Sequence, residues 1–205
     1  WHVFQQMAHL GVDSLPIISL TLLFAGAVMT LQITDVLITY GAQSTVGGLM
    51  AVAMGRELGP ILVGVVLAGR VGAAITAEIG TMKVTEQIDA LRVMAVDPVG
   101  YLVVPRVVAC MIMVPILAFY GVVIGIADGY FVATVIKGLA PSTYLDSIQM
   151  FSTISDFTLG LIKSSVFGAV IALVGAYKGM ETKMGAEAVG FSTTSSVVTS
   201  IILVF

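Results

Sequence analysis

The chain has 205 residues, of which 58% are hydrophobic and 10% charged, and its mean hydropathy is +1.07. In soluble globular domains about a quarter of the residues are charged, so this composition excludes a water-soluble enzyme. The formal net charge of −3 comes from few, scattered side chains, which leaves no basic patch for nucleic acid, and the single cysteine excludes an internal disulfide and a CxxC metal cluster.

The N-terminal residues 1–12 place Trp1, His2 and His9 among apolar neighbours. Such a stretch is typical of an amphipathic helix that lies along a membrane interface. We therefore expect an interfacial helix here, and we interpret the two histidines as interfacial residues rather than as ligands.

Five stretches are long and apolar enough to cross a membrane. A bilayer core about 30 Å thick needs about 20 helical residues, and residues 14–34 and 107–127 carry no charge. Residues 157–177 are interrupted only by Lys163, and residues 188–205 are uncharged. The sequence predicts an all-α integral membrane protein that forms a single transmembrane domain. The expected spans are residues 14–36, 46–77, 106–133, 157–177 and 188–205.

The second expected span differs from the others because it contains charges. Arg56, Glu57 and Arg70 lie within it. Glycine and proline next to the first two charges weaken a helix at that point, so we expect a span with a weakened, kinked middle. The residues concerned are Gly55, Gly59 and Pro60.

Basic residues indicate the side of the membrane on which each connection lies. The connections at 78–105 and 178–187 are rich in lysine and arginine, whereas those at 38–45 and 134–156 contain only Lys137. The positive-inside rule therefore assigns the two basic connections and the N-terminal side to the cytoplasm, and the C-terminus to the outside.

Within the first basic connection, residues 81–95 separate charged from apolar side chains at helical spacing. We expect a short amphipathic helix that Thr85 caps and that Pro98 ends, because proline pushes the preceding Asp97 out of helical geometry. Such a short helix is marginal in water. It is therefore either a loop helix packed on its own chain or a coupling helix seated on a cytoplasmic motor protein, and the pattern alone leaves both open. The charged positions are Lys83, Glu86, Asp89 and Arg92.

Charges deep in a span cost at least about 2.5–3.5 kcal/mol each and normally face protein, water or a polar ligand. Arg56 and Glu57 are sequence neighbours, and neighbouring helix positions point about 100° apart, so they cannot pair well with each other. We expect Glu57 to pair with Lys163, and Arg56 to meet an anionic headgroup, because guanidinium binds phosphate through two hydrogen bonds. The alternative is an ion-paired network that fixes helix packing without a ligand.

Three further charges lie nearer the ends of spans. Arg70 and Glu78 are close to the cytoplasmic end of the second span, and Asp128 is close to the outer end of the third. Side chains so placed can reach the interface, and we assign them no binding role.

Small residues recur every four positions on two expected helices. Gly121, Gly125 and Gly129 share one face of the third span, and Gly55 and Gly59 repeat the spacing in the second. Such stripes let helices approach closely. We expect tight packing at these glycines, within the chain rather than between subunits.

The sequence contains no phosphate-binding loop, no HExxH motif, and no nucleophile with a general base at a recognisable spacing. We therefore expect no catalysis, no cofactor and no metal site in this chain. Any uphill transport would draw its energy from an ion gradient or from an ATPase on a separate chain.

Short motifs of different sequence are spread along nearly the whole chain. They are Gly55–Pro60 (GRELGP), Ala68–Arg70, Thr76–Gly80, Thr85–Gln87, Met94–Pro98, Pro105–Arg106, Leu161–Ser164, Gly185–Gly190, Thr193–Thr194 and Val197–Val198. Together these residues closely resemble the permease subunit of the Mla, or MCE-associated, lipid ABC transporters (the MlaE/YrbE family).

The resemblance implies an ABC-transporter type of permease with five spans, an N-terminal interfacial helix and a cytoplasmic coupling helix. It implies a homodimer in the bacterial inner membrane that moves phospholipid to or from a periplasmic MCE-protein hexamer and so maintains outer-membrane lipid asymmetry. The implied energy source is a cytoplasmic ATPase, which binds ATP and Mg and carries a STAS-domain partner.

By the same similarity, Arg56, Glu57 and Lys163 line a lipid cavity near the dimer axis. One departure concerns Phe191 and Ser195, which flank the threonine pair where the family has basic residues, so the contact that relatives make there is left open. The residues implied to couple to the ATPase are Lys83, Glu86, Gln87, Asp89 and Arg92.

Two functions of other classes also fit these residues. One is an ion-coupled secondary carrier in which Glu57 titrates, and the other is a membrane scaffold that transports nothing. Purification distinguishes them, because a carrier or a scaffold is isolated alone whereas the permease brings an ATPase with it.

Overall fold

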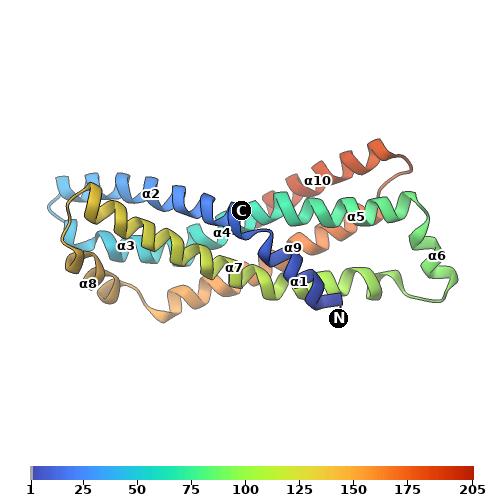
Figure 1. Ribbon diagram of the computed structural model, residues 1–205, viewed down its shortest axis with the longest axis horizontal. Coiled ribbons are helices and arrows are strands. Elements are labelled where there is room, and N and C mark those ends of the chain that lie inside the picture. The colour runs from blue at the N-terminus through green and yellow to red at the C-terminus, as the bar shows by residue number, and fades with distance from the viewer. Residues whose placement is uncertain (1) are drawn as a thin grey trace. The chain divides into compact units, whose positions relative to one another are not determined.

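The computed structural model describes residues 2–205, apart from the side chains of residues 2–5 and 9. Trp1 and the imidazole rings of His2 and His9, which the sequence assigns to a membrane interface, therefore lie outside the described residues. The described chain is built of helices joined by short connections (Figure 1).

The helices vary widely in length and several contain π-helical segments. The α-helices are α1 His2–Val12, α2 Leu15–Thr39, α3 Val46–Ala53, α4 Gly59–Leu67, α5 Ala73–Val84, α6 Gln87–Val93, α7 Val104–Phe131, α8 Pro141–Phe151, α9 Ile154–Met180 and α10 Ala186–Val204. A 3₁₀ turn, η1, covers Gln43–Thr45, and the π-helical segments are η2 Met54–Leu58, η3 Ala68–Gly72, η4 Val99–Val103 and η5 Val132–Ile136.

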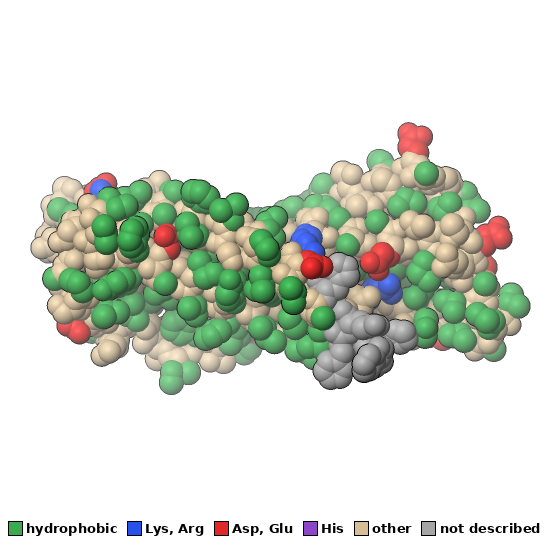
Figure 2. Space-filling view, viewed as in Figure 1, with side chains coloured by type: hydrophobic (Ala, Val, Ile, Leu, Met, Phe, Trp, Pro, Cys, Tyr) green, Lys and Arg blue, Asp and Glu red, His purple; other side chains and the backbone are tan. Residues whose placement is uncertain are grey.

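Five helical segments of the described chain are long and apolar enough to cross a membrane, which confirms the predicted all-α membrane protein with five spans. Hydrophobic side chains also predominate on the face drawn in Figure 2, where charged groups are few and scattered. The five segments are Gln6–Thr39, Gln43–Val84, Val99–Ile136, Ile154–Met180 and Ala186–Val204.

Contacts between Cα atoms divide the chain into two compact units. Unit 1 comprises Gly64–Val114 and Ser164–Phe205, together with the described residues up to Ser14. Unit 2 comprises Leu15–Val63 and Pro115–Lys163. That the whole chain forms one permease domain stays a prediction.

In unit 2, α2 and α7 meet along a row of small residues. A Cβ on Gly26 would lie 2.6 Å from the carbonyl oxygen of Gly125, so the two backbones touch at this point. One turn away on either side, Gly121 faces Leu22, and Gly129 faces Thr30. The constant offset between these pairs shows that α2 and α7 run in the same direction, and that the glycine row of α7 packs within the chain.

Also in unit 2, α8 packs against α3. The sequence predicts only a connection over residues 134–156, so this helix and its contact are not predicted. Pro141 occupies the first turn of α8, where its missing N–H does no harm. The backbone N–H of Gly48 donates to Ser147 Oγ over 3.0 Å, and Ser147 Oγ donates to the Tyr144 carbonyl over 2.8 Å. A Cβ on Gly48 would lie 2.6 Å from the Ser147 carbonyl oxygen, so this close approach depends on glycine in α3.

In unit 1, α10 packs along α5, and buried hydroxyls join helices to one another. Thr76 Oγ1 is 2.8 Å from the Gly72 carbonyl and 3.1 Å from the Gly175 carbonyl. Arg70 extends to the turn after α1, where it lies 2.5 Å from Ser14 Oγ and 3.4 Å from Asp13 Oδ2. Arg70 thus ties the turn after α1 to η3 and has protein partners of its own.

The second span is interrupted where the sequence predicts weakness. Its helix widens into η2 just before Pro60 and again into η3 at Arg70. Pro60 lacks an N–H and its ring clashes with the carbonyl four residues earlier, so regular α-helical bonding is lost at this point. A wider turn replaces it, as often happens at functional sites.

The expected helix over residues 81–95 is wrong in its extent. Thr81–Val84 form the last turn of α5, and a separate α6 covers only Gln87–Val93. The break occurs at Glu86, which has a left-handed backbone with φ of 60°, and a second left-handed residue, Ala95 with φ of 59°, follows the helix. Ile88 alone is buried in α6, so the apolar face is shorter than its spacing indicates.

The expected roles of Thr85 and Pro98 are also corrected. Thr85 Oγ1 donates to the Thr81 carbonyl over 2.8 Å and thus closes α5 instead of capping α6. Asp97 accepts hydrogen bonds from the N–H groups of Val99 and Gly100 over 3.2 and 2.9 Å. Its carboxylate therefore caps the start of the third span, and proline suits the first position of the helix that follows.

Candidate functional site

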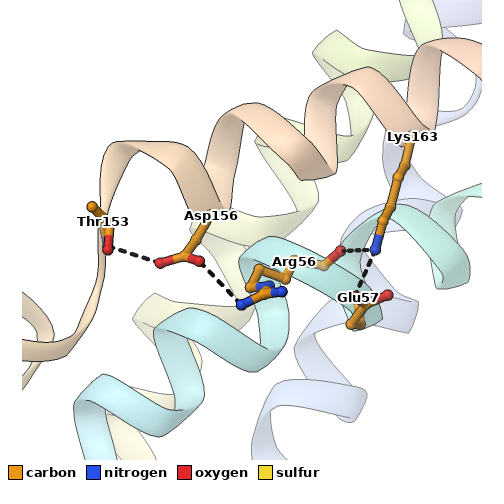
Figure 3. A network of polar contacts seen from close by, with 5 residues as sticks. All are labelled: Arg56, Glu57, Thr153, Asp156 and Lys163. Atoms are coloured by element: carbon orange, nitrogen blue, oxygen red, sulfur yellow. Dashed lines mark hydrogen bonds and ion pairs between the residues drawn. The ribbon is translucent and has the colours of Figure 1, made fainter.

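Charged side chains from η2 and α9 meet inside unit 2. Two acids and two bases take part, and we call them the charged cluster: Arg56, Glu57, Asp156 and Lys163 (Figure 3). Asp156, Gly160 and Lys163 share one face of α9 because they follow helical spacing. A Cβ on Gly160 would collide with the Gly55 carbonyl, so glycine at this position lets α9 approach η2.

Lys163 binds η2 at two points. Its Nζ lies 2.6 Å from Glu57 Oε1 and 3.3 Å from the Arg56 carbonyl oxygen. The first contact is the predicted pair of Glu57 and Lys163. The sequence predicts it because Arg56, the neighbour of Glu57, points in another direction and cannot pair with it. The second contact uses a backbone carbonyl within the π-helical segment, where the irregular hydrogen bonding of the helix favours an outside donor.

Arg56 pairs with an acid that sequence reasoning missed. Its Nη1 lies 3.5 Å from Asp156 Oδ1, while Asp156 Oδ2 accepts from the Thr153 N–H over 2.9 Å. Asp156 also lies in the first turn of α9, where the helix dipole stabilises a negative charge. The helix start thus orients Asp156 toward Arg56.

The charged cluster is balanced in charge but open. The side chains of Arg56, Glu57 and Lys163 are 48%, 52% and 40% exposed, whereas Asp156 is only 12% exposed. A guanidinium has five N–H donors, and the salt bridge to Asp156 involves only Nη1. The arrangement can therefore hold an anionic group at Arg56 while the Glu57–Lys163 pair stays closed. Its pairs agree equally with a network that only fixes helix packing.

The residues expected to couple to an ATPase lie on and beside α6 in unit 1. Asp89 lies 2.9 Å from Arg92 Nη1 and 3.5 Å from Lys83 Nζ, so these three charges interact with one another. Glu86 and Gln87 are exposed, and Gln87 donates to Thr85 Oγ1 over 3.0 Å. The charges of α6 thus form a surface group, separate in the sequence from the charged cluster.

The positions at which the sequence departs from the family pattern line a hollow of about 620 Å³ in unit 1. Phe191, which is 78% exposed, and Ser195 line it from α10. Lys178 lines it from the last turn of α9, and Lys183 lines it from the connection that follows. Glu181 and Glu187 also line the hollow, so two basic and two acidic side chains border it, and α10 presents no basic residue there.

The remaining predicted packing residues also lie at contacts. Gly55 faces the ring of Phe157, and a Cβ on Gly59 would meet a methyl group of Val122. Pro60 lines a small pocket with Gly160 and Leu161. These residues therefore contact α7 and α9, as expected for close helix packing.

Five membrane-length helical segments, with a balanced charged cluster between the second and the fourth of them, define a multi-pass α-helical membrane protein. The chain matches the family model "Permease MlaE" over residues 3–205, and it therefore belongs to the MlaE permease family.

Individual relatives agree with this assignment. The chain is 45% identical over its whole length to a probable ABC transporter permease protein of Synechocystis sp., of which it covers 78%. It is 42% identical over 98% of its length to a probable ABC transporter permease protein of Rickettsia typhi, again covering 78% of that protein. It is also 37% identical to the chloroplastic protein trigalactosyldiacylglycerol 1 of Arabidopsis thaliana, of which it covers 58%. The chain is thus an ABC transporter permease of the MlaE family.

Proposed function

We propose that this chain is the membrane subunit of an ATP-driven phospholipid transporter that moves lipid between the bacterial inner membrane and a periplasmic MCE-protein hexamer. Such transport would maintain outer-membrane lipid asymmetry. Family membership supports the permease role, and the name of the Arabidopsis relative contains that of a glycolipid. The single observation that carries the lipid proposal is the charged cluster between two membrane spans, in which Arg56 is half-exposed.

The proposed partners follow from the transporter class. They are a second copy of the chain, a cytoplasmic ATPase that binds ATP and Mg, a STAS-domain protein held by that ATPase, and the MCE hexamer. The N-terminal side and the two basic connections would face the cytoplasm, with the C-terminus in the periplasm. α6 would then meet the ATPase, and the exposure of Val93 and Met94 beside its charges supports this role.

In this proposal Arg56 recognises the lipid phosphate. Its guanidinium would donate charge-assisted hydrogen bonds to the phosphate in place of, or beside, those to Asp156. Lys163 and Glu57 would neutralise each other and keep the cavity wall polar without attracting a second anion. Binding would thus depend on one arginine whose partner is 3.5 Å away, a distance too long for a strong hydrogen bond.

The alternative of an ion-coupled carrier gains no support from the geometry at Glu57. Glu57 Oε1 lies 2.6 Å from Lys163 Nζ, so this carboxylate already has a basic partner within the chain. We therefore do not adopt it.

Photocrosslinking tests the role of Arg56. We expect Arg56→Ala to reduce, by severalfold, the labelling of the 54–60 and 154–163 segments by a phospholipid that carries a diazirine near its headgroup, in vesicles with the partners present. Arg70→Ala is the matched control, since Arg70 also lies in a π-helical segment but binds Asp13 and Ser14. Unchanged labelling and transport in Arg56→Ala would favour the packing network without a ligand.

A further inference from the structure

A groove of about 490 Å³ runs along the C-terminal half of α7 in unit 2. α7 lines it from Phe119 to Tyr130, and α8 and the start of α9 line the rest, with side chains that include Leu145, Ile148 and Phe157. The groove is open to its surroundings, because Phe119 is 53% exposed and Leu145 is 49% exposed. In a membrane span these surroundings are hydrocarbon.

The surface of the groove has almost nothing to offer a polar ligand. Among the described residues that line it, only Tyr130 and Tyr144 carry a polar group in the side chain. Tyr144 Oη donates to the Ile126 carbonyl over 3.3 Å, and its ring packs edge-on against that of Tyr130, with the centroids 5.7 Å apart. A water molecule needs two to four polar partners, so the chemistry of this surface selects a hydrocarbon occupant.

The length of the groove matches one leaflet of a bilayer. Phe119 and Tyr130 are separated along α7 by about 17 Å, at about 1.5 Å per residue, and each half of a hydrocarbon core about 30 Å thick spans about 15 Å. Phe119 lies near the middle of the uncharged residues 107–127, whereas Tyr130 lies just beyond their outer end, where tyrosine is enriched at the membrane–water interface. With the orientation that the positive-inside rule assigns, the groove therefore runs from the middle of the membrane to its outer surface.

The width of the groove selects a hydrocarbon chain over a helix of another protein. Divided by a length of about 17 Å, the volume gives a mean cross-section of about 30 Å². A helix about 10 Å across occupies about 80 Å², so it cannot enter, whereas an acyl chain is a single file of methylene groups. Because lipid tails are as apolar as the groove itself, retention would come from van der Waals contacts with α7 on one side and α8 on the other.

We propose that this groove binds one acyl chain of a phospholipid of the outer leaflet, with the carboxyl end of the chain at Tyr130 and its methyl end at Phe119 and Phe157. The chain fills the space between α7 and α8 and joins both to the start of α9. At the inner end the ring of Phe157 also faces Gly55, so the lipid ends beside the contact between η2 and α9. The site does not depend on Arg56 or on the proposed transport, because no ion pair has to open for the chain to bind.

Photocrosslinking at two depths tests the site. The full-length protein, with any chains isolated with it, is placed in vesicles of phosphatidylethanolamine and phosphatidylglycerol. A trace of phosphatidylethanolamine carries a diazirine either near the carboxyl group or near the methyl end of one acyl chain. We expect the first probe to label the residues around Tyr130 and the second to label those around Phe119 and Phe157. Labelling should exceed, by severalfold, that around Val28, which is 49% exposed on α2 at the same depth because Gly26 meets Gly125.

Substitutions that fill the groove provide the second half of the test. Ala127→Trp should abolish the labelling, because Ala127 lines the groove and an indole ring would occupy it. Val28→Trp is the matched control, since it places the same side chain at the same depth on α2, and it should leave the labelling unchanged. Arg56→Ala should also leave it unchanged, so this proposal and the proposed headgroup site can fail separately.

Several outcomes would overturn the proposal. Labelling no stronger than that around Val28 would make the groove an ordinary bilayer-facing surface. An inverted order of the two probes would mean that the headgroup points to the charged cluster and that the lipid belongs to the proposed transport site. Labelling that appears only after the accompanying chains are removed would assign the groove to a protein segment. If Ala127→Trp does not fold, Leu145→Trp decides the matter, because it fills the groove from α8.

Discussion

Within the charged cluster, the contact between Lys163 and Glu57 gives a prediction at the scale of single residues. Glu57→Lys or Lys163→Glu alone would place two like charges 2.6 Å apart in a span and should destabilise the protein. The double exchange should recover part of the loss, with a coupling free energy of about 0.5–1.5 kcal/mol. Recovery is partial because a carboxylate at position 163 cannot donate to the Arg56 carbonyl, as Lys163 does.

The measurement is the free energy of unfolding of the natural protein, both single variants and the double variant in the same micelles. Additive losses, without recovery in the double variant, would mean that the two side chains do not interact in the folded protein.

At the residue scale, the sequence predicts this pair because helix geometry leaves Glu57 without a facing neighbour and Lys163 is the charge within the fourth span. It does not predict Asp156 as the partner of Arg56. Asp156 lies at the start of α9 and looks like an end-of-span residue, and only the approach of α9 to η2 at Gly160 brings it within 3.5 Å. Such long-range approaches depend on packing that spacing along the chain does not encode.

At the scale of elements, the contact between α2 and α7 yields the clearest prediction. Gly26→Ala should destabilise the protein by about 1–3 kcal/mol, because the new methyl group would meet the Gly125 backbone at 2.6 Å and a backbone cannot move aside like a side chain. Gly190→Ala, in α10, is the matched control, because nothing lies within 4 Å of its Cβ position. The control should be neutral or stabilise by up to about 1 kcal/mol through helix propensity.

Unfolding midpoints of the two variants in one detergent provide the comparison. Equal effects of the two substitutions would show that the close approach of α2 and α7 does not contribute to stability.

At the scale of elements, the sequence predicts the spans better than it predicts where individual helices begin and end. Uncharged or nearly uncharged runs predict the first, third, fourth and fifth spans, because an unpaired charge in the bilayer is costly. The division at Glu86 is not predictable from its residue type, since glutamate normally favours helix and only the surrounding turn holds it at positive φ. The role of Asp97 and Pro98 was predicted wrongly for another reason, because the dipeptide Asp-Pro occurs both at the ends and at the starts of helices. Here the Asp97 carboxylate accepts hydrogen bonds from the first N–H groups of the following helix, so the dipeptide marks a start.

At the scale of the whole molecule, the proposed complex predicts that the chain is isolated together with an ATPase. Glu86→Lys and Asp89→Lys should lower lipid transfer per ATP hydrolysed by at least about tenfold, equivalent to about 1.4 kcal/mol, without unfolding the membrane helices. Glu86→Lys is the cleaner test, because Asp89→Lys also breaks the contacts with Lys83 and Arg92.

Asp146→Lys, an equal charge reversal on α8, is the control and should leave coupling intact. Both quantities are measured on the reconstituted complex in vesicles. Normal coupling in both α6 variants would remove α6 from the proposed ATPase contact, and isolation of an active transporter without any ATPase would instead favour a carrier.

The two π-helical segments of the second span each contain an extra residue, and this determines where the span can lose a residue. A π-helical turn closes over five residues instead of four, so Met54–Leu58 and Ala68–Gly72 each hold one residue more than an α-helix needs. Loss of one residue there lets the turn close regularly and leaves both flanks facing their former neighbours, whereas the same loss in an unbroken helix rotates everything beyond it by about 100°. A deletion of one residue is thus best absorbed beside Arg56 or Arg70, where it re-aims a cationic side chain without refolding the helix around it.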